Sequence, residues 1–100
     1  MYKGTTPLHT YEVDLDTALI KTIKITYTQN GKEVLVKRTE DCSIEPGKIS
    51  TKLSQEDTFL FDGNSLVTVQ LRLLTTEGDA LRTDSVILSV DECLDDEVLV

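Results

Sequence analysis

The chain has 100 residues, of which 39% are hydrophobic and 28% charged, so it holds enough apolar material for one small core and fits one domain. Its net charge of -8 disfavours nucleic acid and anionic membranes as partners, because both would bring like charges together. No apolar run approaches the ~20 residues of a membrane-spanning helix, and the N-terminus lacks the apolar stretch of a secretory signal, so we expect a cytosolic protein.

Apolar and polar residues alternate along most of the chain, which is the pattern of half-buried β-strands. The first alternating run extends from His9 to Leu15 and the second from Ile23 to Tyr27. The pair Asn30-Gly31 then favours a tight hairpin turn, because both residues tolerate positive φ angles. We therefore expect the second run to pair antiparallel with residues 34–36.

A second turn is predicted at Pro46-Gly47, and the alternating run from Ile49 to Leu53 follows it. Ser54 and the acidic residues directly after it are typical of a helix N-terminus, where a hydroxyl and carboxylates stabilise the first free amides. The sequence therefore predicts one short helical turn at this point.

Two longer alternating runs complete the domain, one from Val67 to Leu73 and one from Leu81 to Val90. A turn at residues 77–79 joins them, and we expect them to form the central hairpin. About seven short strands with a helical turn before the penultimate one predict an all-β fold, an immunoglobulin-like β-sandwich, with a small β-barrel as the alternative. The chain has no Trp, and its two cysteines do not lie in mid-strand as they do in antibody domains.

The last ten residues differ in charge from the rest, because they carry five of the acidic residues and no basic one. We therefore divide the chain into a β-sandwich domain at 1–90 and an acidic tail at 91–100. The tail lacks the spacing and central glycine of a calcium-binding EF-hand loop. Its apolar residues Leu94, Val98 and Leu99 suit docking on a protein partner or along a sheet edge, and they are the predicted contact residues.

No arrangement of residues points to catalysis, a cofactor or a metal. His9 is the only histidine, and it lies on the inward face of the first predicted strand with no acid or nucleophile beside it, which favours a structural role. Cys42 and Cys93 are too far apart for a redox or zinc motif and, in a reducing compartment, are expected to be thiols. We expect a protein that is not an enzyme.

Four segments of the chain together resemble a family of small proteins encoded in phages and prophages of Gram-positive bacteria. They are residues 3–10 (KGTTPLHT), 53–59 (LSQEDTF), 78–81 (GDAL) and 94–99 (LDDEVL). The resemblance spans nearly the whole chain and implies a late-gene product, made in the host cytoplasm and incorporated in the virion as part of the tail or baseplate. It assigns no catalytic or binding residue.

Three functions remain in competition at this point. The first is a non-enzymatic phage structural or assembly protein that acts through contacts with virion proteins or with copies of itself. The second is an immunoglobulin-like adhesion module of the cell surface, which would require export. The third is a hydrolase, which would require convergent polar groups. The absence of an export signal and of a recognisable catalytic motif favours the first.

Overall fold

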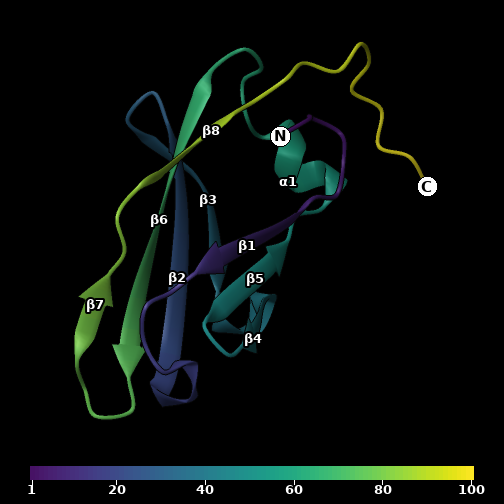
Figure 1. The fold of residues 1–100 in the computed structure, drawn as a ribbon. Coiled ribbons are helices and arrows are strands. Elements are labelled where there is room, and N and C mark those ends of the chain that lie inside the picture. Colours follow the sequence, from purple (N-terminus) through teal and green to yellow (C-terminus); the bar gives the residue numbers. More distant parts are fainter.

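The computed structural model describes residues 1–100 and consists mainly of β-strands (Figure 1). The strands are Leu8–Glu12 (β1), Ile20–Gln29 (β2), Lys32–Arg38 (β3), Cys42–Glu45 (β4), Lys48–Lys52 (β5), Leu66–Thr75 (β6), Ala80–Arg82 (β7) and Val86–Ser89 (β8). The helices are the 3-10 turns Thr17–Leu19 (η1) and Thr39–Asp41 (η2) and the α-helix Gln55–Phe59 (α1). None of them is long and apolar enough to span a bilayer.

The strands form two sheets, and every strand pair is antiparallel. The smaller sheet has the order β1-β5-β4. In the larger sheet the order is β3-β2-β6, and β7 and β8 both pair with the remaining side of β6. The predicted all-β architecture is therefore confirmed, and the strands make two separate sheets rather than the single closed sheet of a barrel.

The two sheets enclose one core. The strands bury alternate residues, as in β6, where every second side chain from Val67 to Leu73 is buried. Thirteen hydrophobic side chains make up this core: Tyr11, Val13, Ile23, Ile25, Tyr27, Ile49, Leu53, Phe61, Val67, Val69, Leu71, Leu73 and Val90. The period-two pattern of the sequence thus places its apolar side chains between the sheets.

The predicted turns and the predicted helix are confirmed. Asn30 and Gly31 have φ angles of 55° and 75°, as the tight hairpin between β2 and β3 requires. Ser54 caps α1, because its hydroxyl accepts a hydrogen bond from the Asp57 amide at 3.0 Å while the Asp57 carboxylate accepts one from the Ser54 amide at 2.9 Å. These reciprocal bonds satisfy two amides that a short helix would otherwise leave free.

The two long runs pair antiparallel as predicted, because β6 pairs with β7 and β8, but the expectation that this hairpin is central was wrong. The segment from Leu81 to Val90 lies at the edge of the larger sheet, whereas β2 and β6 are its central strands. It is also broken into β7 and β8, because the Thr83 hydroxyl takes the place of a backbone carbonyl and accepts the hydrogen bond of the Leu71 amide at 3.1 Å. The sequence analysis also missed β4, whose outward residues gave no alternating apolar pattern.

Candidate protein-contact site

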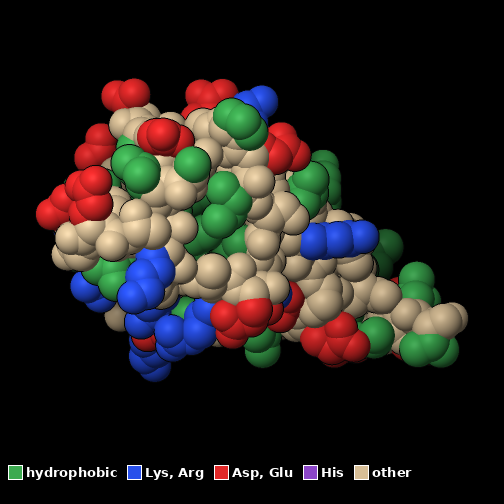
Figure 2. Space-filling model, turned by 90° about the horizontal axis from the view of Figure 1, so that it is seen from below, with side chains coloured by type: hydrophobic (Ala, Val, Ile, Leu, Met, Phe, Trp, Pro, Cys, Tyr) green, Lys and Arg blue, Asp and Glu red, His purple; other side chains and the backbone are tan.

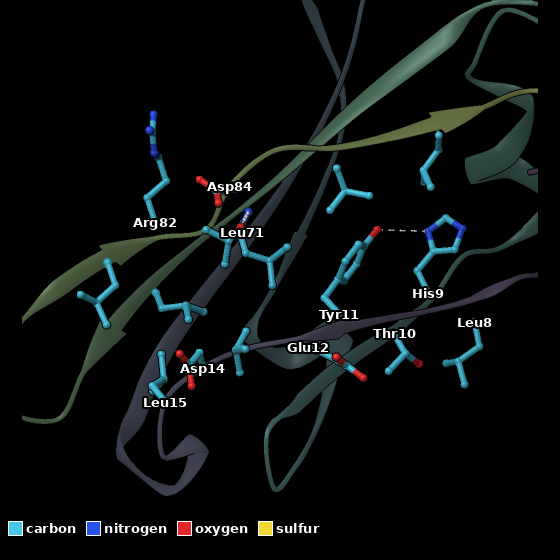
Figure 3. A pocket seen from close by; sticks show the side chains of 16 residues that line it. Leu8, His9, Thr10, Tyr11, Glu12, Asp14, Leu15, Leu71, Arg82 and Asp84 are labelled. Carbon is cyan, nitrogen blue, oxygen red and sulfur yellow. Dashed lines mark hydrogen bonds between the residues drawn. The ribbon is translucent and has the colours of Figure 1, made fainter.

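A groove of about 870 Å³ separates the two sheets along one long edge of the molecule (Figure 3). β1 forms one wall, and β7 with β8 forms the other. The floor contains Leu71 and Leu73 of β6, which are almost fully buried. On the walls, Leu8, Leu81 and Val86 are 64%, 43% and 40% exposed, so the groove presents apolar side chains to solvent. We call it the edge groove.

The β1 wall has a free backbone edge. β1 is the outer strand of its sheet and pairs only with β5. The Pro7 carbonyl accepts from the Leu53 amide and the Val13 amide donates to the Gly47 carbonyl, which places the odd-numbered residues toward β5. Because backbone groups alternate in direction along an antiparallel strand, the amides and carbonyls of Leu8, Thr10 and Glu12 face away from β5. They are available to another strand.

The opposite wall is covered at one end only. The N-terminal residues run parallel to the end of β8, where the Met1 ammonium donates to the Ser89 carbonyl at 2.8 Å and the Asp91 amide donates to the Met1 carbonyl at 2.8 Å. The Lys3 amide then donates to the Asp91 carbonyl at 3.1 Å. Beyond these N-terminal residues, the outer edge of β7 and β8, including Ile87 and the Ser89 amide, pairs with no other strand.

A polar cluster joins the two sheets at the β1 wall of the groove. The Tyr27 hydroxyl oxygen of β2 lies 2.8 Å from Nδ1 of His9 and 2.9 Å from the Tyr11 hydroxyl oxygen of β1. Burial, and next the nearby Met1 ammonium, lowers the pKa of His9, so the imidazole is neutral at pH 7. Burial raises the pKa of Tyr11 and of Tyr27, which keeps both phenols protonated. The cluster therefore holds β1 against the larger sheet by uncharged hydrogen bonds.

The rim of the edge groove is mainly acidic. Glu12, Asp14 and Asp84 lie among its lining residues, against a single cation, Arg82. All four side chains are exposed. The rim therefore attracts neutral or basic segments and repels acidic ones.

The predicted contact residues of the tail lie outside this groove. Leu94 and Leu99 are exposed, at 108% and 71%, and Val98 is partly buried. The tail extends away from the sheets beside α1 (Figure 1), where the side-chain amide of Gln55 bonds both the carbonyl and the amide of Leu99, at 2.9 and 2.8 Å. Its role in binding stays a prediction.

The single histidine and the two cysteines do not lie together in the structure. His9 contacts the two phenols named above. Cys42 is partly buried, Cys93 is exposed, and both are free thiols. Burial, and next the Asp41 carboxylate, raises the pKa of Cys42 and keeps it protonated. No group of three or more His, Cys, Asp or Glu residues is placed to hold a metal ion.

Sequence reasoning missed the edge groove because alternation identifies strands without telling which of them lies at an edge. Leu81 and Val86 looked like ordinary core positions of a central strand, yet they line an open wall. Glu12 and Asp14 could have indicated that the first strand lies at an edge, since charged residues are common beside unpaired strand edges. No family model, no curated protein and no solved structure matches this chain.

Proposed function

We propose that this chain is a non-enzymatic contact module, a structural or assembly protein of a phage or prophage, whose edge groove receives an extended segment of another virion protein. The observation that carries the proposal is a pair of unpaired strand edges facing each other across an apolar floor. Extended segments bind such sites by β-augmentation, in which backbone hydrogen bonds supply affinity and alternate side chains supply selectivity.

The order of the strands supports an immunoglobulin-like sandwich for the module. Counting β7 and β8 as one strand gives seven strands. The order β4-β5-β1 then corresponds to strands D, E and B of an immunoglobulin domain, and β3-β2-β6-β7/β8 corresponds to C′, C, F and G. In such a domain strand A lies beside strand B, which here is β1. The edge groove therefore lies beside β1, at the place that strand A has in such a domain.

The groove also defines the chemistry of the partner segment. A strand that continues the line of Met1 to Lys3 backward would run parallel to β8 and meet the free Ser89 amide and the free edge at Ile87. Its inward side chains would lie over Leu71 and Leu73. Because the rim is acidic, the segment should alternate small or medium apolar residues with neutral or basic ones.

The phage setting of the proposal comes from the resemblance of the four sequence segments, and the contact role comes from the geometry of the edge groove. The two agree in kind, because a small domain with open strand edges can join larger proteins in an assembly. The partner segment then belongs to another protein of the particle.

Site-specific photo-cross-linking tests this function. A benzophenone side chain replaces Leu81 in the groove, and Leu60, which is 57% exposed at the end of α1, serves as the matched control position. Both variants are produced in a prophage-carrying host after induction and irradiated. We expect the variant at Leu81 to cross-link one particle protein through a segment of alternating apolar and non-acidic residues. Equal products from both positions, or a cross-linked metabolic protein, would refute the proposal.

A further inference from the structure

Four cations lie in one line across the outer face of the larger sheet. Lys24 of β2 lies directly opposite Arg38 of β3 on one side and Arg72 of β6 on the other, and Arg72 lies opposite Arg82 of β7. Residues directly opposite in a sheet project from the same face, so the four side chains form a continuous row over four strands. We call it the cation row. With strands about 4.8 Å apart, it is about 14 Å long.

No member of the cation row forms an ion pair within the chain. The one ion pair in the structure joins Lys37 to Asp57 at 2.7 Å, and Lys37 projects from the opposite face of the sheet. The next row along the face contains Thr26 and Gln70, both uncharged. Acidic residues lie near the two ends of the row, where the Asp41 carboxylate accepts from the Arg38 backbone amide at 3.0 Å and Asp84 follows Arg82 by two residues. By register, the central cations Lys24 and Arg72 have no acidic residue beside them. Like charges directly opposite each other destabilise a sheet, so this alignment carries a cost that an anionic partner would remove.

The charge of the whole molecule makes this row exceptional. The chain has 10 basic and 18 acidic residues, yet four of the basic ones stand in a single line. Figure 2 shows the molecule from below, with several Lys and Arg side chains gathered at the lower left and Asp and Glu side chains along the upper left and beside them. A protein of net charge -8 that keeps such a row has a local site for a strongly acidic group.

We propose that the cation row binds the acidic segment 91–97 of a second copy of this chain. That segment carries five carboxylates in seven residues, Asp91, Glu92, Asp95, Asp96 and Glu97. Extended at about 3.3 Å per residue it covers about 20 Å, which is enough to cross the whole row. The charges are complementary, and all five acidic residues are exposed.

The tail of the same molecule does not reach its own cation row in the structure. Leu99 is held by Gln55 at the start of α1. α1 lies on the inner side of the larger sheet, where Lys37 bonds Asp57, whereas the neighbouring Arg38 projects from the outer face. In this arrangement the sheet lies between each tail and its own row, which favours a neighbouring copy as the source of the acidic segment.

The contact joins two different surfaces, so it is head-to-tail and produces rings or open chains of copies. Its occupant differs from that of the edge groove, because the segment that the groove receives is not acidic, and Arg82 is common to both surfaces. The variants that test the row leave Arg82 unchanged, so failure of one contact leaves the other intact.

Sedimentation velocity over a range of protein concentrations tests the contact. The pair Arg38→Gln and Arg72→Gln removes half the row, and the pair Lys48→Gln and Lys52→Gln removes the same charge from exposed positions of β5 as a control. We expect the wild type to self-associate at low ionic strength and to dissociate as salt rises, since the screening length falls to about 8 Å at 0.15 M. The row variant should raise the dissociation constant about tenfold, and the control should match the wild type.

Charge reversal identifies which surfaces meet. One variant carries Lys24→Glu and Arg72→Glu in the row, and another carries Asp95→Lys and Asp96→Lys in the tail. Each alone should associate more weakly than the wild type, because the first has a row of net charge 0 and the second a tail of net charge -1, whereas in the mixture the unchanged row of the second meets the unchanged tail of the first. Mixed in equal amounts they should associate again. Circular dichroism and thermal melting of each variant confirm that loss of association is not loss of fold.

Three results would overturn the proposal. The first is a wild type that stays monomeric at every concentration and salt. The second is association that both reversed variants keep, which would place the contact elsewhere. The third is a row that binds duplex DNA or the tail of its own chain, the latter seen as chemical shift changes at the row on tail truncation that do not depend on concentration.

Discussion

The two long edges of the molecule join its sheets in opposite ways. At the β3 edge, η2 leads the chain directly from one sheet into the other, the Thr51 hydroxyl donates to the Asp41 carbonyl at 3.0 Å, and Lys37 pairs with Asp57. At the β1 edge the sheets part around the edge groove. The closed edge satisfies its polar groups within the chain, whereas the open edge leaves backbone groups and apolar side chains for another molecule. We therefore expect stability to depend on the closed edge, and the proposed contact lies at the open one.

The largest expected effect is on the free energy of unfolding, and it distinguishes a residue on the floor of the groove from one on its wall. Leu71 is 1% exposed and Leu81 is 43% exposed. Leu71→Ala should lower the free energy of unfolding by about 2–5 kcal/mol, because it leaves a cavity in the shared core. Leu81→Ala should cost less than about 1 kcal/mol, because its side chain already meets water. Denaturant titration measures both, and equal losses would mean that the wall is part of a closed core.

At the closed edge, Asp57→Ala should lower the free energy of unfolding by about 1–2 kcal/mol. The substitution removes the acceptor of the Ser54 amide and the partner of Lys37. Burial alone would raise the pKa of Asp57, but the bonds from Lys37 and Ser54 outweigh it and lower that pKa. The folded pKa is thus below the unfolded one, so the contribution is present above about pH 4 and is lost as pH falls below it.

Thermal midpoints of the wild type and of Asp57→Asn, measured as pH falls from neutral to acid, check the sign. The thermal midpoint of the wild type should exceed that of Asp57→Asn at neutral pH, and this difference should disappear below about pH 4. A wild type that gains stability on acidification through that range would contradict the role of the pair in closing this edge.

Proline substitution should distinguish a free strand edge from a paired one. Thr10 and Ser50 lie directly opposite each other, and their hydroxyl oxygens are 2.9 Å apart. The Thr10 amide faces the edge groove, whereas the Ser50 amide faces β4. Ser50→Pro should therefore lower the free energy of unfolding by about 1 kcal/mol more than Thr10→Pro does. This difference is the contribution of one hydrogen bond between strands. If Thr10→Pro is the more damaging, the edge is not free.

The smallest effect concerns the polar cluster at the open edge. Because the folded pKa of His9 is below its unfolded value of about 6.5, its neutral form stabilises the protein above that pH, and this contribution is lost as pH falls. Melting midpoints between pH 7 and pH 5 should fall for the wild type and fall less for His9→Gln. Identical slopes would show that His9 is protonated without cost and does not hold β1 in place.

Local sequence patterns predicted the strands and turns well, but they did not predict features that depend on contacts between distant residues. The hairpin at Asn30-Gly31 and the cap at Ser54 depend on neighbouring residues, so the sequence alone identified both. The break between β7 and β8 depends on the Thr83 hydroxyl meeting Leu71, twelve residues away, which no periodicity encodes.

The candidate surfaces were harder to foresee than the fold. The tail was singled out by its charge, yet the cation row needs the register of four strands, because its members are 10 to 58 residues apart in the sequence. The edge groove likewise depends on which strands end the sheets, and alternation is the same in edge and central strands.

The most direct test of the open edge adds the strand that it lacks. The six residues Val-Thr-Val-Thr-Val-Thr are placed before Met1, so that the valines share the inward, β8-facing register of Met1, and a control extension replaces each Val with Pro. Amide exchange at Ser89 and Ile87 and the thermal midpoint are then measured, each kcal/mol of stabilisation being worth about 4–8 °C. We expect slower exchange at both amides and a higher midpoint for the valine extension alone. Unchanged exchange and midpoint, or equal changes with the proline extension, would contradict a groove that receives a strand.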